Sequence, residues 1–351
     1  MRPNSATDTR SSATLDVTVI LCTYNRCRDL ACALESVAKS QMAPTVSWEV
    51  LVVDNNSTDE TRNVVEEFCQ RYPGRFRYHF ESRQGVTYAR NAGIANSRGE
   101  VLAFTDDDVT VLPTWLQNLT AELLRDPQWA GAGGRTLPAE KFTPPAWLSE
   151  DMNGWGEVAF AYFDIGDNAV QLSRPPYGAN MAFRGRVFAK YGGFRTDLGR
   201  NPGNKIGNED TELGRRLLAA GERLRYEPAA IVYHPVPYGR ITQEYFFSSW
   251  FDYGRAMIKE RGDRPNVFGI PRDYLALMCR IGEIAVWSLR GMLALRPNER
   301  FRYKCRVWRN KGQMAELYRS SVDRKRSKTA GTADTVGAEK PPATCSGGGR
   351  A

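Results

Sequence analysis

The sequence lacks several features that would assign it to other classes of protein. No apolar run reaches the roughly 18 uncharged residues that a membrane-spanning helix needs. The nearest run, residues 274–295, is interrupted by Arg280, Glu283 and Arg290. The first 15 residues are polar and contain no apolar core of a secretion signal. We therefore expect a cytoplasmic protein without a spanning helix and with a disordered N-terminus, residues 1–15.

Closely spaced cysteine pairs are missing as well. The chain has seven cysteines, and Cys22, Cys27 and Cys32 lie five residues apart instead of forming the CxxC pairs that suit zinc. We interpret the cysteines as reduced and mostly structural. The net charge of +8 includes a basic excess in the last third, but no recognisable nucleic-acid-binding module accompanies it. We therefore expect no nucleic-acid partner.

The first part of the chain alternates between strand-like and helix-like patterns. β-branched apolar runs are followed by apolar residues at helical spacing, and Ser57 with Glu60 has the spacing of a capping box for the second helix. The alternation predicts an α/β fold with a mixed, mostly parallel sheet flanked by helices. The expected strands are 17–22, 49–54, 76–80 and 101–105, and the third helix spans about 87–96.

The pattern is looser from Pro113 onward. We expect a helix near 115–125, then an irregular region that includes the glycine-rich stretch 131–134 and a Pro/Trp-rich segment, 138–155. Regular structure returns with a strand over 180–184, a helix that Asp210 opens and Gly221 ends, and a strand over 231–234. The segment 241–320 is helical, aromatic and basic, and 321–351 is a polar tail that we expect to be disordered.

Polar residues cluster directly after the expected strands. In a parallel sheet the carboxyl ends of the strands meet at one edge, and ligands bind there. Asp106, Asp107 and Asp108 crowd one such end, where like charges raise each other's pKa unless a hard cation neutralises them. Because residues i and i+2 of an extended segment share a face, Asp106 and Asp108 are expected to share a ligand while Asp107 points elsewhere. A solvated acidic turn remains an equal alternative from this triplet alone.

Other polar residues also carry two interpretations each. Asp54 suits a turn as well as a ligand site. Glu209 and Asp210 open a helix, where carboxylates are good caps, and where one of them would also be held rigidly as a general base. His234 ends an apolar strand, where it is either a structural residue or a metal ligand. Diphosphate partners are sought among the basic residues Arg83, Arg90, Arg184 and Lys205.

Taken together and in order, five segments resemble glycosyltransferase family 2, the inverting enzymes of the GT-A fold. The resemblance covers about residues 17–240, and it depends on the ordered combination because a lone DDD or ED motif is weak. The segments are VTVILCTYNR (17–26), VVDNNSTDET (52–61), RQGVTYARNAGIANSRGEVLAFTDDDV (83–109), PYGANMAFRGRVFAKYGGF (176–194) and NEDTELGRRLLAAG (208–221).

The resemblance implies a role for each matched residue. Asp210 would be the catalytic base with Glu209 beside it, and Asp108 with His234 would bind a divalent metal, Mn²⁺ or Mg²⁺. Asp54 would contact the nucleobase and Asp106 the ribose, while Asp107 would be mainly positional. The full set expected around the nucleotide-diphosphate sugar is Thr23, Asn25, Arg26, Asp54, Asn56, Arg90, Asp106 and Asp107.

The resemblance also implies the partners. The donor would be a nucleotide-diphosphate sugar, with a UDP-sugar as the first choice, and the acceptor a glycan or a lipid-linked glycan of cell-envelope or exopolysaccharide biosynthesis. The segment 241–320 would either contact the inner face of the cell membrane or only pack on the core. Two alternatives stay open at this point: a catalytically idle glycan-binding scaffold on the same fold, and a metal-dependent phosphotransfer hydrolase.

Overall fold

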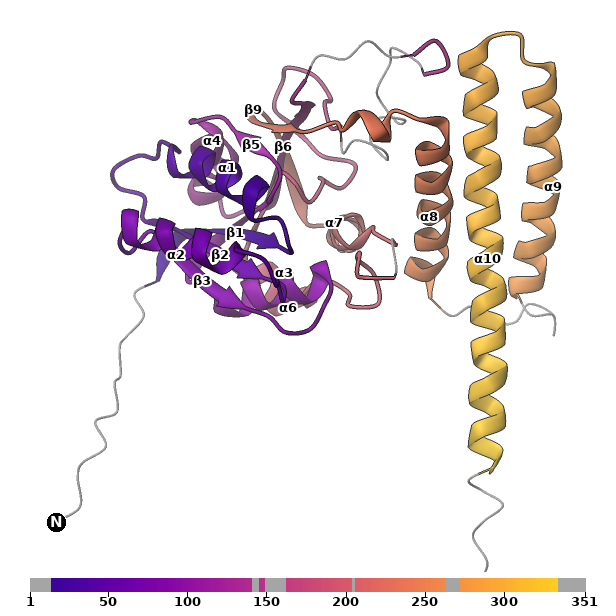
Figure 1. The fold of residues 1–351 in the computed structure, drawn as a ribbon, viewed down its shortest axis with the longest axis horizontal. Helices are drawn as coiled ribbons and strands as arrows, with labels where there is room; N and C mark the ends of the chain where they lie inside the picture. Colours follow the sequence, from indigo (N-terminus) through magenta and orange to yellow (C-terminus); the bar gives the residue numbers. More distant parts are fainter. Residues whose placement is uncertain (1–13, 141–144, 149–161, 204–205, 263–271, 334–351) are drawn as a thin grey trace, which may run out of the picture.

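A nine-stranded mixed sheet lies at the centre of the fold, and a row of long helices stands beside it (Figure 1). The computed structural model describes residues 14–140, 145–148, 162–203, 206–262 and 272–333. The sheet order is β3-β2-β1-β4-β8-β6-β9-β5, with β7 paired to β9. The predicted α/β architecture with a C-terminal helical extension is confirmed. We expected residues 1–15 to be disordered, and residues 1–13 of this segment lie outside the described residues.

The parallel half of the sheet comes from the alternating N-terminal pattern. Its strands pair in parallel, and β2 is buried along its whole length, as expected for a strand covered on both faces. The strands are β1 (Leu15–Thr23), β2 (Trp48–Asp54), β3 (Phe76–Phe80) and β4 (Gly99–Asp106), and the helices between them are α1 (Cys27–Ala38), α2 (Thr61–Arg71) and α3 (Val86–Asn96).

The predicted capping box at the start of α2 is wrong. Ser57 does not cap this helix, since its hydroxyl oxygen accepts the backbone N–H of Asn25. Asp59 takes up the helix-end donors instead, because its carboxylate accepts the N–H groups of Thr61 and Cys27. The residues before α2 therefore tie the turn after β1 to the turn after β2.

The glycine-rich stretch expected to be irregular is a buried strand, β6 (Trp129–Pro138). Its glycines are needed for close contact: a Cβ on Gly131 would collide with Phe183, and a Cβ on Gly134 with the carbonyl of Ala230. Glycine lowers strand propensity, so the sequence pattern hid this strand. The other strands of this half are β5 (Thr110–Val111), β7 (Val170–Gln171), β8 (Met181–Arg184) and β9 (Arg223–His234).

Helices cover both faces of the sheet. One apolar core includes residues of α1, α2 and α4 (Trp115–Arg125), and the core on the other face includes residues of α3, α6 (Gly185–Tyr191) and α7 (Glu209–Ala219). The chain leaves α7 at Gly221, whose φ of 80° is the left-handed conformation predicted for a glycine that ends a helix. Leu213 and Leu217 bury the apolar side of α7 in the second core.

Three long helices follow β9 and the short helix η1 (Tyr238–Arg240): α8 (Gln243–Arg261), α9 (Arg272–Leu293) and α10 (Pro297–Ala333). In Figure 1, α10 stands between α8 and α9, and α9 is farthest from the sheet. A Cβ on Gly254 would collide with the carbonyl of Arg309, and one on Gly312 with the carbonyl of Phe251, so these glycines let α8 and α10 pack closely.

The last helix is longer than the sequence indicated. It continues to Ala333, although disorder was expected from residue 321. The segment is polar, but Lys, Arg and Ala favour helix and no glycine occurs between residues 313 and 330, so polarity was a poor guide to order here. Residues 334–351 lie outside the described residues. Within the described residues, no helix has the length and apolar character to cross a membrane.

Candidate functional site

The register of the parallel strands brings the predicted polar residues to one edge of the sheet. Thr23 at the end of β1 is paired with Asp54 at the end of β2, and Cys22 is paired with Asp106 at the end of β4. Three strand ends separated by long stretches of sequence thus become neighbours. This is the edge at which ligands bind to parallel sheets.

Asp54 is buried at this edge, 2% exposed, and both of its carboxylate oxygens accept hydrogen bonds. Oδ1 accepts the N–H of Ser57 at 2.9 Å, and Oδ2 accepts the hydroxyl of Tyr78 at 2.8 Å. Asn25 and Asn56 take the left-handed conformation, with φ of 50° and 67°, which Asn tolerates better than most residues. The turns after β1 and β2 therefore have fixed shapes.

Asp107 is held by the protein itself, as its expected positional role requires. Its carboxylate accepts the Thr23 hydroxyl at 2.8 Å and the Arg26 guanidinium at 3.0 Å, and it is 6% exposed. Burial raises the pKa of Asp107 to about 6, although Arg26 and the Thr23 hydrogen bond lower it. Arg26 also donates to Asp108 at 2.9 Å, so one half-exposed cation neutralises two of the three crowded carboxylates.

The remaining members of this edge form a metal-binding arrangement. Asp106, Asp108 and His234 each offer one ligand atom, and these atoms lie within 4.8 Å of one another. The carbonyl of Pro235 can only accept, so His234 Nδ1 at 2.9 Å carries a proton, and Nε2 is the nitrogen that can bind a metal. That Nε2 lies 3.6 Å from Asp108 Oδ1, and a cation between them could bind both atoms. The donor set and its orientation fit a divalent cation.

Arg90 on α3 links this edge to α7. It donates to Glu209 Oε1 at 2.7 Å and lies 3.4 Å from Asp106 Oδ1, and it is 5% exposed. Burial raises the pKa of Glu209, although Arg90 lowers it, so the two groups depend on each other for neutralisation. Arg90, which was expected beside the donor, contacts Glu209 and Asp106 in the structure.

Asp210 is more accessible than its neighbour Glu209. Its Oδ2 accepts the backbone N–H of Gly178 at 2.6 Å, and its Oδ1 accepts the N–H of Thr211 at 2.6 Å. Gly178 has no room for a side chain, because a Cβ would collide with the guanidinium of Arg90. The segment before β8 thus passes between Arg90 and Asp210, and no signal in the sequence singled out Gly178.

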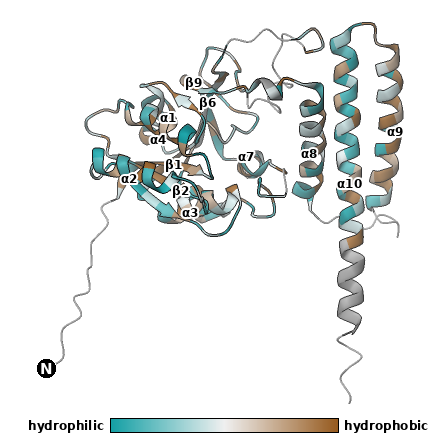
Figure 2. Cartoon of the chain, in the orientation of Figure 1, coloured by the Kyte–Doolittle hydropathy of each residue, from teal (hydrophilic) through white to brown (hydrophobic). Residues whose placement is uncertain are grey.

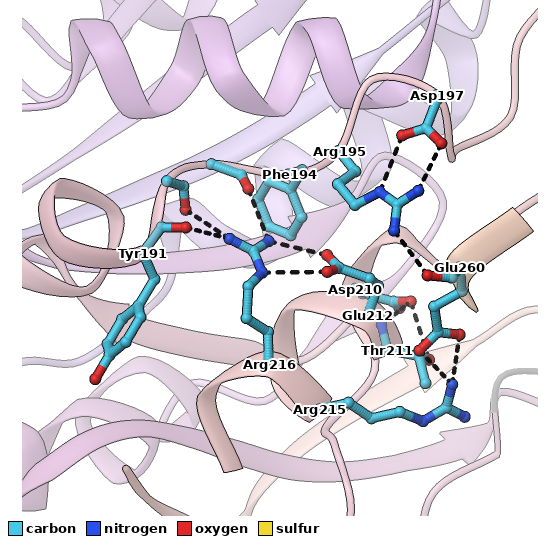
Figure 3. A network of polar contacts seen from close by, with 12 residues as sticks. Tyr191, Phe194, Arg195, Asp197, Asp210, Thr211, Glu212, Arg215, Arg216 and Glu260 are labelled. Atoms are coloured by element: carbon cyan, nitrogen blue, oxygen red, sulfur yellow. Dashed lines mark hydrogen bonds and ion pairs between the residues drawn. The ribbon is translucent and has the colours of Figure 1, made fainter. Parts of the chain in front are cut away.

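A network of arginines fixes α7 in place (Figure 3). Arg216 donates to Glu212 and to the backbone carbonyl of Gly193, while Arg195 donates to the backbone carbonyl of Glu260 at the end of α8. The carboxylate of Glu260 accepts Arg215 of α7 at 2.7 Å. The helix that carries Asp210 is therefore bound to the C-terminal extension as well as to the sheet.

One of the basic residues considered as diphosphate partners lies elsewhere. Arg184 is paired with Val101 at the beginning of β4, so it lies at the opposite edge of the sheet, where it is buried and bonded to Glu100. Arg83 is paired with Glu81. Lys205 and much of the segment 138–155 lie outside the described residues.

Comparison with known proteins agrees with this geometry. The profile "Glycosyl transferase family 2" matches residues 18–192. The succinoglycan biosynthesis protein ExoM of Rhizobium meliloti is 30% identical over 247 residues, which cover 69% of this chain and 74% of that protein. The chain belongs to glycosyl transferase family 2.

Further relatives include two proteins of Haloferax volcanii. The glucosyl-dolichyl phosphate glucuronosyltransferase is 26% identical over 252 residues, covering 70% of this chain and 77% of that protein. The glycosyltransferase AglE is 28% identical over 284 residues, covering 80% and 83%. This family 2 chain is a glycosyltransferase, and membership in the family removes the phosphotransfer hydrolase alternative.

Solved structures with a similar fold are GT-A glycosyltransferases. The mannosyltransferase PcManGT of Pyrobaculum calidifontis, in complex with GDP-Man and Mn²⁺, has a TM-score of 0.57 at 19% identity and covers 87% of this chain and 90% of that chain. GalNAc-T7 with UDP, GalNAc and Mn²⁺ has a TM-score of 0.52 at 16% identity and covers 73% and 53%. At these identities the likeness establishes the GT-A fold.

Proposed function

We propose that this family 2 enzyme transfers a sugar from a nucleotide-diphosphate sugar to a hydroxyl of a glycan or lipid-linked glycan, with inversion at the anomeric carbon. The proposal rests on the arrangement of carboxylates around Arg90. The metal-binding group that includes Asp106 lies on one side, and Glu209 with the accessible Asp210 lies on the other. A donor bound at the strand ends would then present its anomeric carbon toward α7.

The names of relatives and neighbours support the substrate classes. One relative is named for succinoglycan biosynthesis and another for glucosyl-dolichyl phosphate, which supports an acceptor in cell-envelope or exopolysaccharide biosynthesis. The two structural neighbours contain GDP-Man or UDP together with Mn²⁺. We take a UDP-sugar with Mn²⁺ or Mg²⁺ as the first donor to test.

Each residue at the site has a task in this reaction. Thr23, Asn25, Asp54 and Asn56 shape the nucleobase end, with Asp106 on the ribose side. Asp108 and His234 would hold the metal, which when bound neutralises charge on the leaving diphosphate. Arg26 is exposed enough to turn from Asp108 toward that diphosphate. Arg90 and Asp107 position these groups without contacting the donor.

The proton of the acceptor hydroxyl passes to Asp210. The N–H groups of Gly178 and Thr211 hold the Asp210 carboxylate in one orientation, and its accessibility leaves it open to an acceptor, whereas Glu209 is buried against Arg90. The acceptor oxygen then forms a bond to the anomeric carbon as the bond to the diphosphate breaks. Attack from the face opposite the leaving group inverts the configuration, and no covalent enzyme intermediate forms.

Nucleotide release from a panel of activated sugars, with Mn²⁺ or Mg²⁺, tests the proposal. We expect release from one preferred donor, and a loss of about 10² to 10⁴ in rate for Asp210→Asn while donor protection in a thermal shift assay persists. Asp167→Asn, the same change at a 93% exposed side chain, should leave the rate unchanged. Donor binding without release by the wild type would favour the idle scaffold, and no nucleotide effect with either metal would contradict the proposal.

A further inference from the structure

The outer helix α9 exposes an apolar face that no other part of the described chain covers. Bulky apolar side chains recur at helical spacing along its length, including Met278, Met292 and Leu293, which are 65%, 77% and 71% exposed. The full set, with the turn that follows, is Tyr274, Leu275, Met278, Ile281, Val286, Leu289, Met292, Leu293 and Leu295. In Figure 2 the helix is largely brown and stands at the far edge of the molecule.

The inner side of α9 packs on α10 and includes the half-buried Leu277 and Ile284 as well as polar and aromatic contacts. Arg280 donates to Gln313 of α10 at 3.0 Å, and Trp287 stacks on Tyr303 of α10 with ring centroids 5.8 Å apart. Apolar side chains therefore occur on both sides of α9, whereas an ordinary surface helix is apolar mainly on the side that faces the core. A contiguous exposed apolar face of this extent is typical of a surface that binds something.

The charge of the same region indicates what it binds. Residues 272–319 have a net charge of +7: α9 itself has +1, and the turn and the first part of α10, residues 294–319, add eight basic and two acidic residues. Exposed cations, among them Arg290 and Arg296, lie at the end of the apolar face near the turn into α10. An anionic bilayer satisfies both features, since its interior takes up apolar side chains and its headgroups attract Lys and Arg.

We propose that the apolar face of α9 lies in the surface of an anionic lipid bilayer, parallel to the membrane plane. The described helices do not meet the requirements for crossing a membrane, so the interaction is interfacial. A second copy of this chain fits less well, because it would bring two segments of +7 together. This inference goes beyond the proposed glycosyl transfer and does not depend on which donor or acceptor is used.

Flotation of the full chain with lipid vesicles tests the proposal. We expect binding to vesicles of phosphatidylcholine mixed with phosphatidylglycerol, weaker binding to phosphatidylcholine alone, and weaker binding at high salt. The triple variant Met278→Gln, Leu289→Gln, Met292→Gln keeps helix-forming residues while removing apolar contact. It should lower the partition coefficient on the order of tenfold to a hundredfold.

A matched variant guards against a general effect of lost hydrophobicity. Ile165 and Val170 are 38% and 43% exposed on the sheet domain, and Ile165→Gln with Val170→Gln should leave vesicle binding unchanged. Circular dichroism and nucleotide release establish that both variants are folded. Equal binding by the wild type and the triple variant, or no binding by the wild type to either vesicle, would overturn the proposal.

Two further measurements distinguish a lipid bilayer from a second copy of the chain as the partner of this face. Sedimentation that shows a wild-type dimer dissociated by the triple variant, without vesicle binding, would assign the face to a second copy. Cys279 on α9 and Cys32 on α1 are both exposed, so each can be labelled in a variant that lacks the other cysteines. An environment-sensitive dye should shift to the blue on adding anionic vesicles at Cys279 and not at Cys32, and the same response at both sites would contradict the proposal.

Discussion

The guanidinium of Arg90 donates to Glu209 at 2.7 Å and lies 3.4 Å from Asp106, so one buried cation joins the end of β4 to the beginning of α7. The two contacts span 119 and 16 positions of sequence. This cation fixes the distance between the donor side of the site and the helix that carries Asp210. A shift of either element would leave a buried charge without its partner.

Arg90→Met should destabilise the fold as well as the site. Glu209 would remain buried without a cation, and breaking a buried pair in this way costs about 3–5 kcal/mol of unfolding free energy. Adding Glu209→Gln should recover part of that stability, because the uncompensated charge is gone, but it should not recover glycosyl transfer. Urea unfolding and nucleotide release measure the two effects. Full recovery of both in the double variant would show that the bridge has no positioning role.

Asp107 and Asp108 should respond differently to removal of the carboxylate. Asp107→Ala leaves the buried Thr23 hydroxyl without its acceptor and Arg26 with Asp108 alone, and should lower stability by about 1–3 kcal/mol. Asp108→Ala relieves repulsion between like charges, so stability should hold, but protection by Mn²⁺ with a nucleoside diphosphate should be lost. Thermal shift with and without EDTA compares the two, and equal behaviour of both variants would refute the division of roles.

Gly312→Ala should loosen α10 from α8. The new methyl group would meet the carbonyl of Phe251, and overpacking of this kind costs about 1–3 kcal/mol. Gly282 on α9 has open space at its Cβ position, so Gly282→Ala should stabilise the helix by up to about 1 kcal/mol. Thermal unfolding of the full chain measures both, and a stabilising effect of Gly312→Ala would contradict the packing.

Acid should reveal the role of Asp59 in joining the turns after β1 and β2. Desolvation raises the pKa of this exposed carboxyl group, but hydrogen bonds from Thr61 and Cys27 outweigh it and lower the pKa to about 2. A carboxyl group with a depressed pKa stabilises the fold above its unfolded pKa of 3.8, and this stabilisation is lost as pH falls toward 2. The stability advantage of wild type over Asp59→Asn, measured by urea unfolding, should therefore shrink between pH 4 and about 2. A constant advantage would show that Asp59 acts through packing alone.

The parallel half of the sheet was predictable because β1, β2 and β4 contain apolar runs, while β3 is short and rich in aromatic residues. The strand β6 was not, since Gly131 and Gly134 are chosen for contact with distant residues and lower the local strand signal. The same limit applied to α2, where Asp59 rather than Ser57 takes the helix-end donors. A local sequence pattern indicates the secondary structure that a segment favours on its own. These two exceptions are instead determined by contacts with residues far away in the sequence.

Most of the candidate site could be located for a simple reason: its residues follow parallel strands, which end at the same edge. The exceptions arise from antiparallel strands and long-range pairs. Arg184 lies at the wrong edge because β8 runs opposite to β4. The contact between Arg90 and Glu209 and the passage of Gly178 between Arg90 and Asp210 depend on how α3, α7 and the segment before β8 pack, which no local pattern encodes.

The order of helices α8, α10 and α9 bears on how far a membrane-anchored acceptor must extend to reach Asp210. Helix axes in contact lie about 8–10 Å apart, so the outer side of α9 lies roughly 20 Å beyond the axis of α8, while α7 lies on the sheet side of α8 (Figure 1). If α9 rests on a bilayer, an acceptor anchored in the same leaflet must span at least that gap before its terminal hydroxyl meets Asp210. This orientation would therefore set a minimum length for a membrane-anchored acceptor.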